Sequence, residues 1–210
     1  MKEKFGIIYY RVHIEFLSLV LGTALFKLKS MLWGIGAGKN IKVWGAVDVV
    51  KGPKSSIKIG DNVSLVSCSL RASAAPLYSR VKLRTFTPNA AIIIGNNVGL
   101  SGTGITARSR SIQIGNGTII GPNVIITDSD FHALWPPDNR TCNPALENDK
   151  DVFIGKNVWI GMNSVILKGA NIGDNSIIGA GSIVTGSIPS NCVAAGNPAK
   201  QIKTLPQGDK

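Results

Sequence analysis

A strict period of six residues constrains the fold of this chain more than any other feature. From residue 154 onward the sequence reads IGKNVW, IGMNSV, ILKGAN, IGDNSI, IGAGSI and VTGSIP, so an aliphatic residue returns at every sixth position. A helix would require apolar spacings of three and four, and a half-buried strand would require alternation at two. The period therefore predicts a repeat in which each unit supplies one short strand and one turn. The aliphatic positions are Ile154, Ile160, Ile166, Ile172, Ile178 and Val184.

Pieces of the same pattern occur earlier, around Ile41, Ile59, Ile94 and Ile114, so most of the chain from about residue 40 onward is expected to be one array. Three units close a triangular coil of about eighteen residues, and coils stack at about the 4.8 Å spacing between strands. Inside such a stack, Ile and Val form aliphatic ladders. The 24 glycines and only 6% aromatic residues fit tight corners and a narrow interior. The pattern predicts an all-β fold, a parallel β-helix.

The repeat also divides the chain. We expect an N-terminal helical segment at 1–37, a β-helix domain at 38–203 and a C-terminal tail at 204–210. Two interruptions, at 66–90 and 127–150, are expected to loop out of the rigid coil, where insertions tend to carry function. The first interruption is either polar loop surface or a contact for a saccharide or a lipid-linked phosphate. Its basic and aromatic residues are Arg71, Arg80, Lys82, Arg84, Tyr78 and Phe86.

The N-terminal segment contains an apolar stretch from Phe16 to Phe26, followed by Lys27 and Lys29. This stretch is shorter than the roughly twenty apolar residues that a membrane-spanning helix needs. The residues after it offer no small-residue site for signal-peptide cleavage. We expect a helix that caps one end of the coil, with an interfacial helix in peripheral contact with the membrane as the alternative.

The net charge of +11 attracts phosphate without regard to sequence, but no nucleic-acid-binding motif accompanies it, so nucleic acid is not an expected partner. Cys68, Cys142 and Cys192 are odd in number and widely spaced, which fits neither a disulfide framework nor a metal-binding pair. We therefore expect reduced thiols and a cytoplasmic protein, in peripheral contact with the inner face of the membrane if the N-terminal helix is interfacial.

The segment from Val158 to Lys200, VWIGMNSVILKGANIGDNSIIGAGSIVTGSIPSNCVAAGNPAK, resembles the C-terminal signature of the hexapeptide-repeat acetyltransferases. The resemblance covers about residues 38–203 and is strongest to the galactoside, maltose and polysaccharide O-acetyltransferases. It implies a left-handed coil, an exception to the usual right-handed crossover. It also implies a homotrimer with active sites between neighbouring prisms, and acetyl-CoA as the co-substrate, with no metal required for the chemistry.

The resemblance implies a catalytic role for His132, because the family's general base follows a segment matching GPNV, which here ends at Val124. Histidine's ordinary pKa near 6.5 suits removal of a proton from a sugar hydroxyl and its return to a departing thiol. A carboxylate on the other ring nitrogen would fix the tautomer. Asp128 and Asp130 are both candidates for this role, and in some relatives a backbone carbonyl performs it.

The resemblance also implies the donor and acceptor residues. Residues matching Trp159, Gly161, Ala180 and Thr185 contact the pantetheine arm in the family, and Lys200 and Lys203 match the positions that meet the nucleotide phosphates. Ser101 and Thr103 stand where galactoside-type relatives carry an acceptor-binding asparagine, so we expect hydroxyl contacts with a different acceptor.

The expected function is transfer of an acetyl group from acetyl-CoA to a hydroxyl of a saccharide, or of a lipid-linked saccharide, in surface polysaccharide biosynthesis. One alternative is N-acetylation of an amino-sugar nucleotide. A second is a non-catalytic β-helix scaffold. The carbonic-anhydrase-like β-helices hold zinc with three histidines, and this chain has two.

Overall fold

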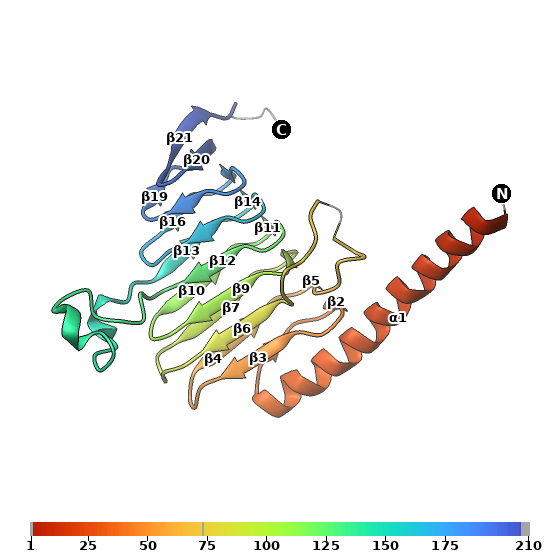
Figure 1. The fold of residues 1–210 in the computed structure, drawn as a ribbon, viewed down its shortest axis with the longest axis horizontal. Coiled ribbons are helices and arrows are strands. Elements are labelled where there is room, and N and C mark those ends of the chain that lie inside the picture. Colours follow the sequence, from red (N-terminus) through yellow and green to blue (C-terminus); the bar gives the residue numbers. More distant parts are fainter. Residues whose placement is uncertain (1, 73, 207–210) are drawn as a thin grey trace.

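The computed structural model describes residues 2–72 and 74–206, with side chains described from residue 12 onward. The molecule is a triangular prism of stacked coils, with a long helix lying across the end where the first coil begins (Figure 1). Three sheets form the faces of the prism, and successive strands from β1 to β20 go to the three sheets in turn. We name the sheets A, B and C in the order in which the chain reaches them.

Sheet A contains β1 (Gly36–Ala37), β4 (Ser56–Ile59), β7 (Ala91–Ile94), β10 (Ser111–Ile114), β13 (Val152–Ile154), β16 (Asn171–Ile172) and β19 (Ser187–Ile188). Sheet B contains β2 (Lys42–Trp44), β5 (Ser64–Val66), β8 (Gly99–Ser101), β11 (Ile119–Ile120), β14 (Trp159–Ile160), β17 (Ile177–Ile178), β20 (Cys192–Gly196) and β21 (Ala199–Thr204). Sheet C contains β3 (Asp48–Lys51), β6 (Lys82–Thr85), β9 (Gly104–Ala107), β12 (Ile125–Thr127), β15 (Val165–Ile166) and β18 (Ile183–Val184).

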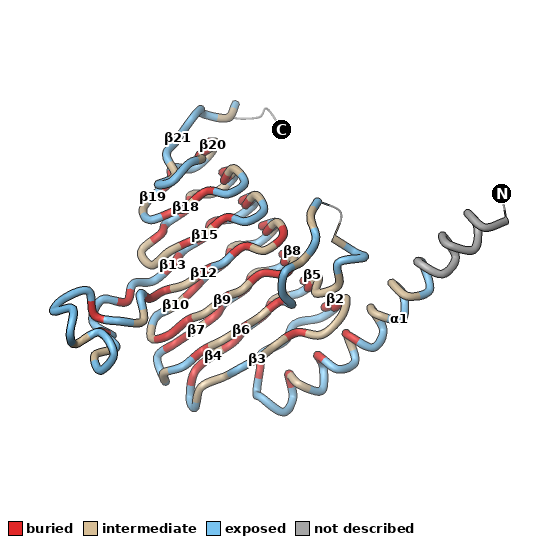
Figure 2. The backbone as a smooth tube through the Cα atoms, in the orientation of Figure 1, coloured by how far each residue is buried: buried red, intermediate tan, exposed pale blue. Residues whose placement is uncertain are grey.

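The six aliphatic positions of the repeat are fully buried in the prism, as the period of six predicts. Ile154 pairs with Ile172 on sheet A, one coil later, and corresponding pairs join Ile160 to Ile178 on sheet B and Ile166 to Val184 on sheet C. The buried positions follow the inside of every coil (Figure 2). The fold is a left-handed parallel β-helix with an N-terminal helix, which confirms the expected fold class.

The corner between sheets A and B shows why the repeat pairs glycine with asparagine. A Cβ on Gly115 would lie 2.5 Å from the carbonyl carbon of Gly155 in the next coil, so this glycine is required for close approach of the backbones. The left-handed conformation falls instead on the residue two positions later, such as Asn157 with φ 54°. The Asn157 side chain donates a hydrogen bond of 3.2 Å to Asn175 Oδ1 in the next coil. At the equivalent position in the preceding coil the chain carries Gly117, with φ +73°.

Helix α1 (Lys2–Trp33) covers the open end of the first coil. It approaches closely because a Cβ on Gly22 would lie 2.5 Å from the Val43 carbonyl oxygen. Thr23 Oγ1 accepts a hydrogen bond of 3.1 Å from the Val43 amide, and Lys29 Nζ donates one of 2.8 Å to the Val47 carbonyl. Phe26 is buried against the coil. These contacts satisfy backbone groups of β2 and of the segment after it that would otherwise face solvent at the end of a stack.

Much of α1 is exposed (Figure 2), and many of its exposed residues are apolar. The residues Val12–Trp33 are long and apolar enough to cross a membrane by length and composition alone. The expectation that this segment is too short to span was therefore wrong, because the helix continues beyond the stretch from Phe16 to Phe26 at both ends. The exposed apolar residues are Val12, Phe16, Leu17, Val20, Leu21, Leu25, Leu28, Met31, Leu32 and Trp33.

Two loops interrupt the coil. Residues 67–81 connect β5 to β6 at the edge between sheets B and C, and residues 128–151 connect β12 to β13 at the edge between sheets C and A. The second loop matches the expected interruption at 127–150 and contains two short 3₁₀ helices, η1 (Pro137–Asn139) and η2 (Leu146–Asn148). The expected interruption at 66–90 was too long, because β6 and the turn into β7 belong to the coil: Leu83 and Thr85 point inward and are buried. In the C-terminal tail, residues 207–210 lie outside the described part of the chain.

Candidate active site

The loop that carries His132 is fixed to the coil by a buried carboxylate. The Asp128 side chain accepts hydrogen bonds from the backbone amides of Arg108, Ser109 and Arg110, at 2.7, 2.9 and 2.8 Å. Burial raises the pKa of Asp128 above its ordinary value, against the lowering effect of these amides. All three amides lie in the turn between β9 and β10, one coil earlier, so Asp128 holds two coils together where the loop begins.

A buried ion pair closes the other end of the same loop. Arg108 donates from Nε and Nη2 to the two carboxylate oxygens of Asp149, at 2.9 and 2.8 Å, and the Ser109 hydroxyl adds a bond of 2.6 Å. Burial alone would raise the pKa of Asp149, but the hydrogen bonds and charge of Arg108, with help from Ser109 and Ser129, hold it below its ordinary value. The Arg108 guanidinium also lies over the Phe131 ring, 5.4 Å from its centroid. Phe131, with φ 66°, immediately precedes His132.

His132 is oriented by a backbone carbonyl. Its Nδ1 lies 2.8 Å from the carbonyl oxygen of Arg140, within the same loop. A carbonyl oxygen only accepts hydrogen bonds, so Nδ1 carries the proton and Nε2 presents its lone pair. The imidazole is exposed, so Nε2 is open to a substrate. This geometry holds the imidazole in one tautomer and leaves Nε2 able to accept a proton.

Neither candidate aspartate bonds to His132 in the described part of the chain. Asp128 is occupied by the amides described above, and Asp130 forms an ion pair of 2.5 Å with Lys168 Nζ. The expectation that one of them orients the imidazole is thus contradicted by these contacts, and the carbonyl alternative fits the geometry. Both aspartates act on the loop: Lys168 also donates to the Asn148 carbonyl at 3.0 Å, so the Asp130 ion pair draws the two ends of the loop together.

Three of the expected donor-binding residues line one cavity of about 330 Å³ on sheet B. Trp159, Gly161 and Ala180 form it together with Met162, and Ala74 of the loop 67–81 lies at its side. Gly161 cannot carry a side chain, because a Cβ would lie 2.4 Å from the Ala180 amide nitrogen. The wall is mostly apolar, and Trp159 is exposed, which suits contact with the alkyl and amide parts of an extended ligand.

The two lysines lie on the same sheet, further along the stack. Trp159 aligns with Ile177, Ile177 with Val193, and Val193 with Lys203 across adjacent strands of sheet B. Strand spacing places Lys203 about 14 Å from Trp159 along the prism. Lys200, which pairs with Ala195, lies on the same added strand, β21. An extended ligand that lies in the cavity and continues along sheet B would thus approach the positive charges of Lys200 and Lys203.

Thr185 is not part of this cavity. It follows β18 at the edge between sheets C and A, whereas Ala180 precedes that strand at the edge between sheets B and C. Thr103 is fully buried, with its hydroxyl donating 3.3 Å to the Ser101 carbonyl, so the expected contact between Thr103 and an acceptor is contradicted. Ser101, at the end of β8, is half-buried and remains a candidate.

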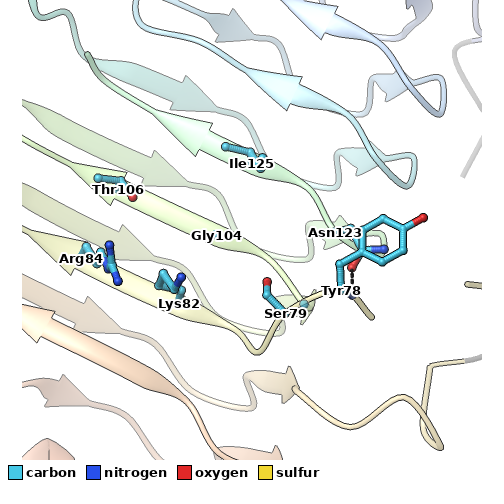
Figure 3. A pocket seen from close by; sticks show the side chains of 9 residues that line it. Tyr78, Ser79, Lys82, Arg84, Gly104, Thr106, Asn123 and Ile125 are labelled. Carbon is cyan, nitrogen blue, oxygen red and sulfur yellow. Dashed lines mark hydrogen bonds between the residues drawn. The ribbon is translucent and has the colours of Figure 1, made fainter. Parts of the chain in front are cut away.

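Sequence analysis missed a basic pocket of about 320 Å³ on sheet C. Lys82 and Arg84 project from β6 into it, Thr106 lies on the neighbouring strand β9, and Tyr78 and Asn123 close its other end (Figure 3). The two cations were assigned to a loop. The alternation of Lys82 and Arg84 with inward-facing Leu83 and Thr85 is the strand signal that would have placed them side by side on one face.

Within the described residues, no three His, Cys, Asp or Glu side chains are grouped as a metal site would require. The three cysteines are free: Cys68 is half-buried, Cys142 exposed and Cys192 buried.

Comparison with known proteins connects this fold to a family. The family model described as "Bacterial transferase hexapeptide (six repeats)" matches residues 151–186. The galactoside O-acetyltransferase of Lactococcus lactis is 40% identical over 122 residues, which is 55% of this chain and 56% of that protein. The galactoside O-acetyltransferase of Escherichia coli is 42% identical over 103 residues, 48% of this chain and 47% of that protein. The chain thus matches about half the length of these curated relatives.

Two further proteins bear on the comparison. An Escherichia coli protein provisionally named a lipopolysaccharide biosynthesis O-acetyl transferase is 39% identical over 122 residues, 53% of this chain and 60% of that protein. The structure of AntD, an N-acyltransferase from Bacillus cereus in complex with dTDP and 3-hydroxybutyryl-CoA, aligns with a TM-score of 0.62 over 87% of this chain and 89% of that chain. At 20% identity, the AntD structure supports the fold alone. With its unbroken hexapeptides and its left-handed prism, the chain carries the bacterial transferase hexapeptide repeat and is similar, over about half its length, to hexapeptide-repeat O-acetyltransferases.

Proposed function

We propose that the protein transfers an acetyl group from acetyl-CoA to a saccharide hydroxyl in the biosynthesis of a surface polysaccharide, with His132 as the general base. The observation that carries the proposal is the hydrogen bond of 2.8 Å between His132 Nδ1 and the Arg140 carbonyl. It leaves Nε2 as a proton acceptor on an exposed loop. The named O-acetyltransferases among its relatives support transfer to oxygen.

The chemistry follows from that geometry. Nε2 removes the proton from the acceptor hydroxyl as its oxygen attacks the thioester carbonyl, which gives a tetrahedral intermediate and an imidazolium. The Arg140 carbonyl stabilises the imidazolium through Nδ1–H. Collapse of the intermediate breaks the carbon–sulfur bond, and the departing thiolate takes the proton back from Nε2. The products are the acetyl ester and free coenzyme A.

The proposed donor site consists of Trp159, Gly161 and Ala180 along the pantetheine arm, with Lys200 and Lys203 toward the nucleotide phosphates. Lysines serve here as point charges on a flexible stem. Thr185 lies at the edge between sheets C and A, away from the cavity of its own chain. It would contact the pantetheine arm only in the cavity of a neighbouring copy, so its role depends on the assembly proposed next.

A single chain does not bring base and donor cavity together. The loop 128–151 projects from the edge between sheets C and A, whereas the cavity lies on sheet B on the other side of the prism (Figure 1). We therefore infer a homotrimer in which the His132 loop of one copy faces the donor cavity of the next. The loop tip carries Leu134 and Trp135, which are 65% and 80% exposed in one chain and would be covered by the neighbour.

Substitution of the base tests the reaction. His132→Ala should lower the rate of thiol release in the presence of acceptor by about 10²–10⁴-fold, the usual contribution of a general base. His13→Ala, which removes the other histidine, is the matched control and should retain activity. Retention of full activity by His132→Ala would refute His132 as the base, whereas absence of thiol release in the wild-type protein would favour the scaffold alternative.

Mixing two inactive variants tests the shared site. His132→Ala lacks the base, and Ala180→Trp fills the donor cavity. If each site combines two copies, random mixed trimers restore about a quarter of the wild-type activity, because half of the bases and half of the cavities are intact. No recovery in the refolded mixture, with trimers present by light scattering, would place base and donor site in one chain.

The alternative, N-acetylation of an amino-sugar nucleotide, uses the same fold and the same donor and differs in the atom that attacks the thioester. The two products differ in stability. An acetyl ester is released by mild alkali, whereas an acetyl amide persists under the same treatment. Mass analysis of the product before and after alkali therefore distinguishes them.

We further propose a cytoplasmic location with α1 in peripheral contact with the inner face of the membrane. Phe16 and Leu17 are 66% and 55% exposed on the part of α1 that precedes its contacts with the coil. Replacing both with serine should abolish co-sedimentation with anionic vesicles. Ile202→Ser, which removes an equally exposed apolar side chain on β21, should not. Equal binding by both variants would refute the membrane contact.

A further inference from the structure

The basic pocket on sheet C lies between the loop 67–81 and the strand that leads to His132. Its outer rim is Tyr78 and Ser79, its floor is Gly104, and its side is formed by the charged residues of β6 (Figure 3). None of these residues has a role in the proposed chemistry, and the pocket is separate from the donor cavity on sheet B.

The pocket is built for negative charge. Lys82 and Arg84 are two residues apart on β6, so both side chains point out of the same face of the sheet. Among the residues that line the pocket, all within the described range, none is acidic. Asp48 aligns with Lys82 on the next strand, but it lies outside the pocket and 3.9 Å from Arg80. Two cations half-buried side by side repel each other unless an anion joins them.

One of the residues that line the pocket has a donor without a partner. Arg84 Nε is buried and makes no hydrogen bond within the described part of the chain. A buried donor left unpaired is unfavourable, and a bound anion relieves this when the guanidinium turns toward it. Guanidinium groups match phosphate oxygens in geometry, and the Lys82 ammonium adds a point charge beside it.

The floor of the pocket is open because it lacks a side chain. A Cβ built on Gly104 would meet no heavy atom within 4 Å, so this position faces free space. The neighbouring Thr106 hydroxyl adds a neutral donor at the floor. The Tyr78 ring at the rim offers a flat surface for a sugar or a base (Figure 3). Thr106 aligns with Thr127, the last residue of β12, after which the chain continues to His132.

We propose that this pocket binds the pyrophosphate of a phosphate-linked saccharide, so that the acceptor is an activated sugar and not a free neutral one. Its role as acceptor site rests on the proposed function, whereas pyrophosphate binding stands without it. The sugar end then extends along sheet C toward the His132 loop. A sugar nucleotide and a lipid-linked sugar present the same pyrophosphate, so the pocket chemistry is common to both.

Calorimetry on the full chain tests the binding. Inorganic pyrophosphate and UDP-N-acetylglucosamine should bind at low ionic strength, and free N-acetylglucosamine should bind much more weakly. The double variant Lys82→Gln/Arg84→Gln should weaken pyrophosphate binding by at least about tenfold, and Gly104→Val should do so by filling the floor. Equal affinity of both variants and the wild-type protein for pyrophosphate would overturn the proposal.

The chain supplies matched controls. Lys58→Gln removes an exposed lysine from sheet A. Gly99→Val adds the same side chain at the first residue of β8, where a Cβ also meets free space. Both should bind pyrophosphate as the wild-type protein does. If they lose affinity as much as the pocket variants, the interaction is general attraction to a basic protein and the pocket is not a site.

The acceptor role has its own readout. Acetyl transfer to a nucleotide-linked sugar and to a short prenyl-pyrophosphoryl sugar should exceed transfer to the free sugar, and the excess should disappear in Gly104→Val. Preferred transfer to the prenyl form identifies a lipid-linked acceptor, and preferred transfer to the nucleotide form identifies a soluble one. Equal transfer to free and phosphate-linked sugars would overturn the acceptor role. If the wild-type protein binds pyrophosphate but transfers no acetyl group to any acceptor, the proposed function is refuted and the pyrophosphate site remains supported.

Discussion

The two loops of the prism differ in how they are held. The loop 128–151 is attached to the coil by buried charged groups. The Asp128 carboxylate accepts hydrogen bonds from three backbone amides, and Arg108 forms an ion pair with Asp149. The loop 67–81 is tied mainly by neutral hydrogen bonds, in which Asn123 Oδ1 accepts from the Tyr78 amide and Asn123 Nδ2 donates to the Pro76 carbonyl, both at 2.9 Å. A cation–π contact of 5.1 Å joins Arg71 to Trp44.

The difference fits the proposed roles. A base must be held in one geometry, and buried charge-assisted hydrogen bonds provide that rigidity. The loop 67–81 borders both the donor cavity, through Ala74, and the basic pocket, through Tyr78 and Ser79. Ligands must enter and leave beside it, and weaker attachment lets it move at low cost. The strength of each attachment is therefore the quantity to test.

Breaking the buried ion pair should have the largest effect. Arg108→Met leaves the Asp149 carboxylate buried without its partner, which costs about 3–5 kcal/mol in the free energy of unfolding. Arg110→Met is the matched control, because Arg110 is exposed, and it should change stability by less than about 0.5 kcal/mol. Urea unfolding measures both. A loss below about 1 kcal/mol for Arg108→Met would show that the loop is not anchored by charge.

The same anchor should weaken in acid. The pKa of Asp149 is lower in the folded protein than its ordinary value of 3.8, so its contribution to stability is present above that pH and is lost as the pH falls through the folded value. The contribution of Asp128 to stability has the opposite pH dependence. Because its pKa is raised in the folded protein, its protonated form favours folding at low pH, and its ionisation disfavours folding at higher pH.

The test compares wild-type protein with Asp149→Asn. The difference in their unfolding free energies should shrink below about pH 4, with a slope of at most about 1.4 kcal/mol per pH unit for one proton. A constant difference from pH 6 to pH 3 would contradict the anchoring role of the Asp149 charge. Asp151→Asn, at the exposed end of the loop, serves as the control.

Releasing the loop 67–81 should cost less. Asn123→Gly removes two hydrogen bonds while keeping a residue that accepts φ near 62°, so we expect a loss of about 1–2 kcal/mol. Proteolysis within 67–81 should become faster, with the loop 128–151 unaffected. Equal cleavage of both loops would indicate global unfolding and contradict independent attachment.

The smallest effect is expected for the matched variant Asn97→Gly. Asn97 has a similar φ of 57°, but its side chain accepts one exposed hydrogen bond from Asn62, at 3.1 Å. A loss of about 0.5 kcal/mol or less in thermal unfolding is expected, without added cleavage at 67–81. If Asn97→Gly lost as much stability as Asn123→Gly, the stabilising effect would come from asparagine at any corner of the coil. It would not come from the hydrogen bonds between Asn123 and the loop 67–81.

Much of the site was predictable from local signals, and the errors share a cause. Trp159, Gly161 and Ala180 were assigned together, and the structure places them in one cavity because they belong to regular coils with a fixed period. Asp128 was assigned to His132 because the two are near in sequence, yet it bonds to amides 18 to 20 residues away, one coil earlier. Lys82 and Arg84 were assigned to a loop because the repeat is irregular around them.

The sequence by itself determined the prism, because one aliphatic residue in six fixes which side chain enters the interior and leaves few alternative registers. It also determined that His132 lies on a loop outside the regular coil. The tertiary structure decided the partner of the imidazole, the burial of Arg108 with Asp149 and the pairing of two cations over an open glycine floor. These depend on contacts between stacked coils, such as the 41-residue separation of Arg108 and Asp149, which no local pattern records.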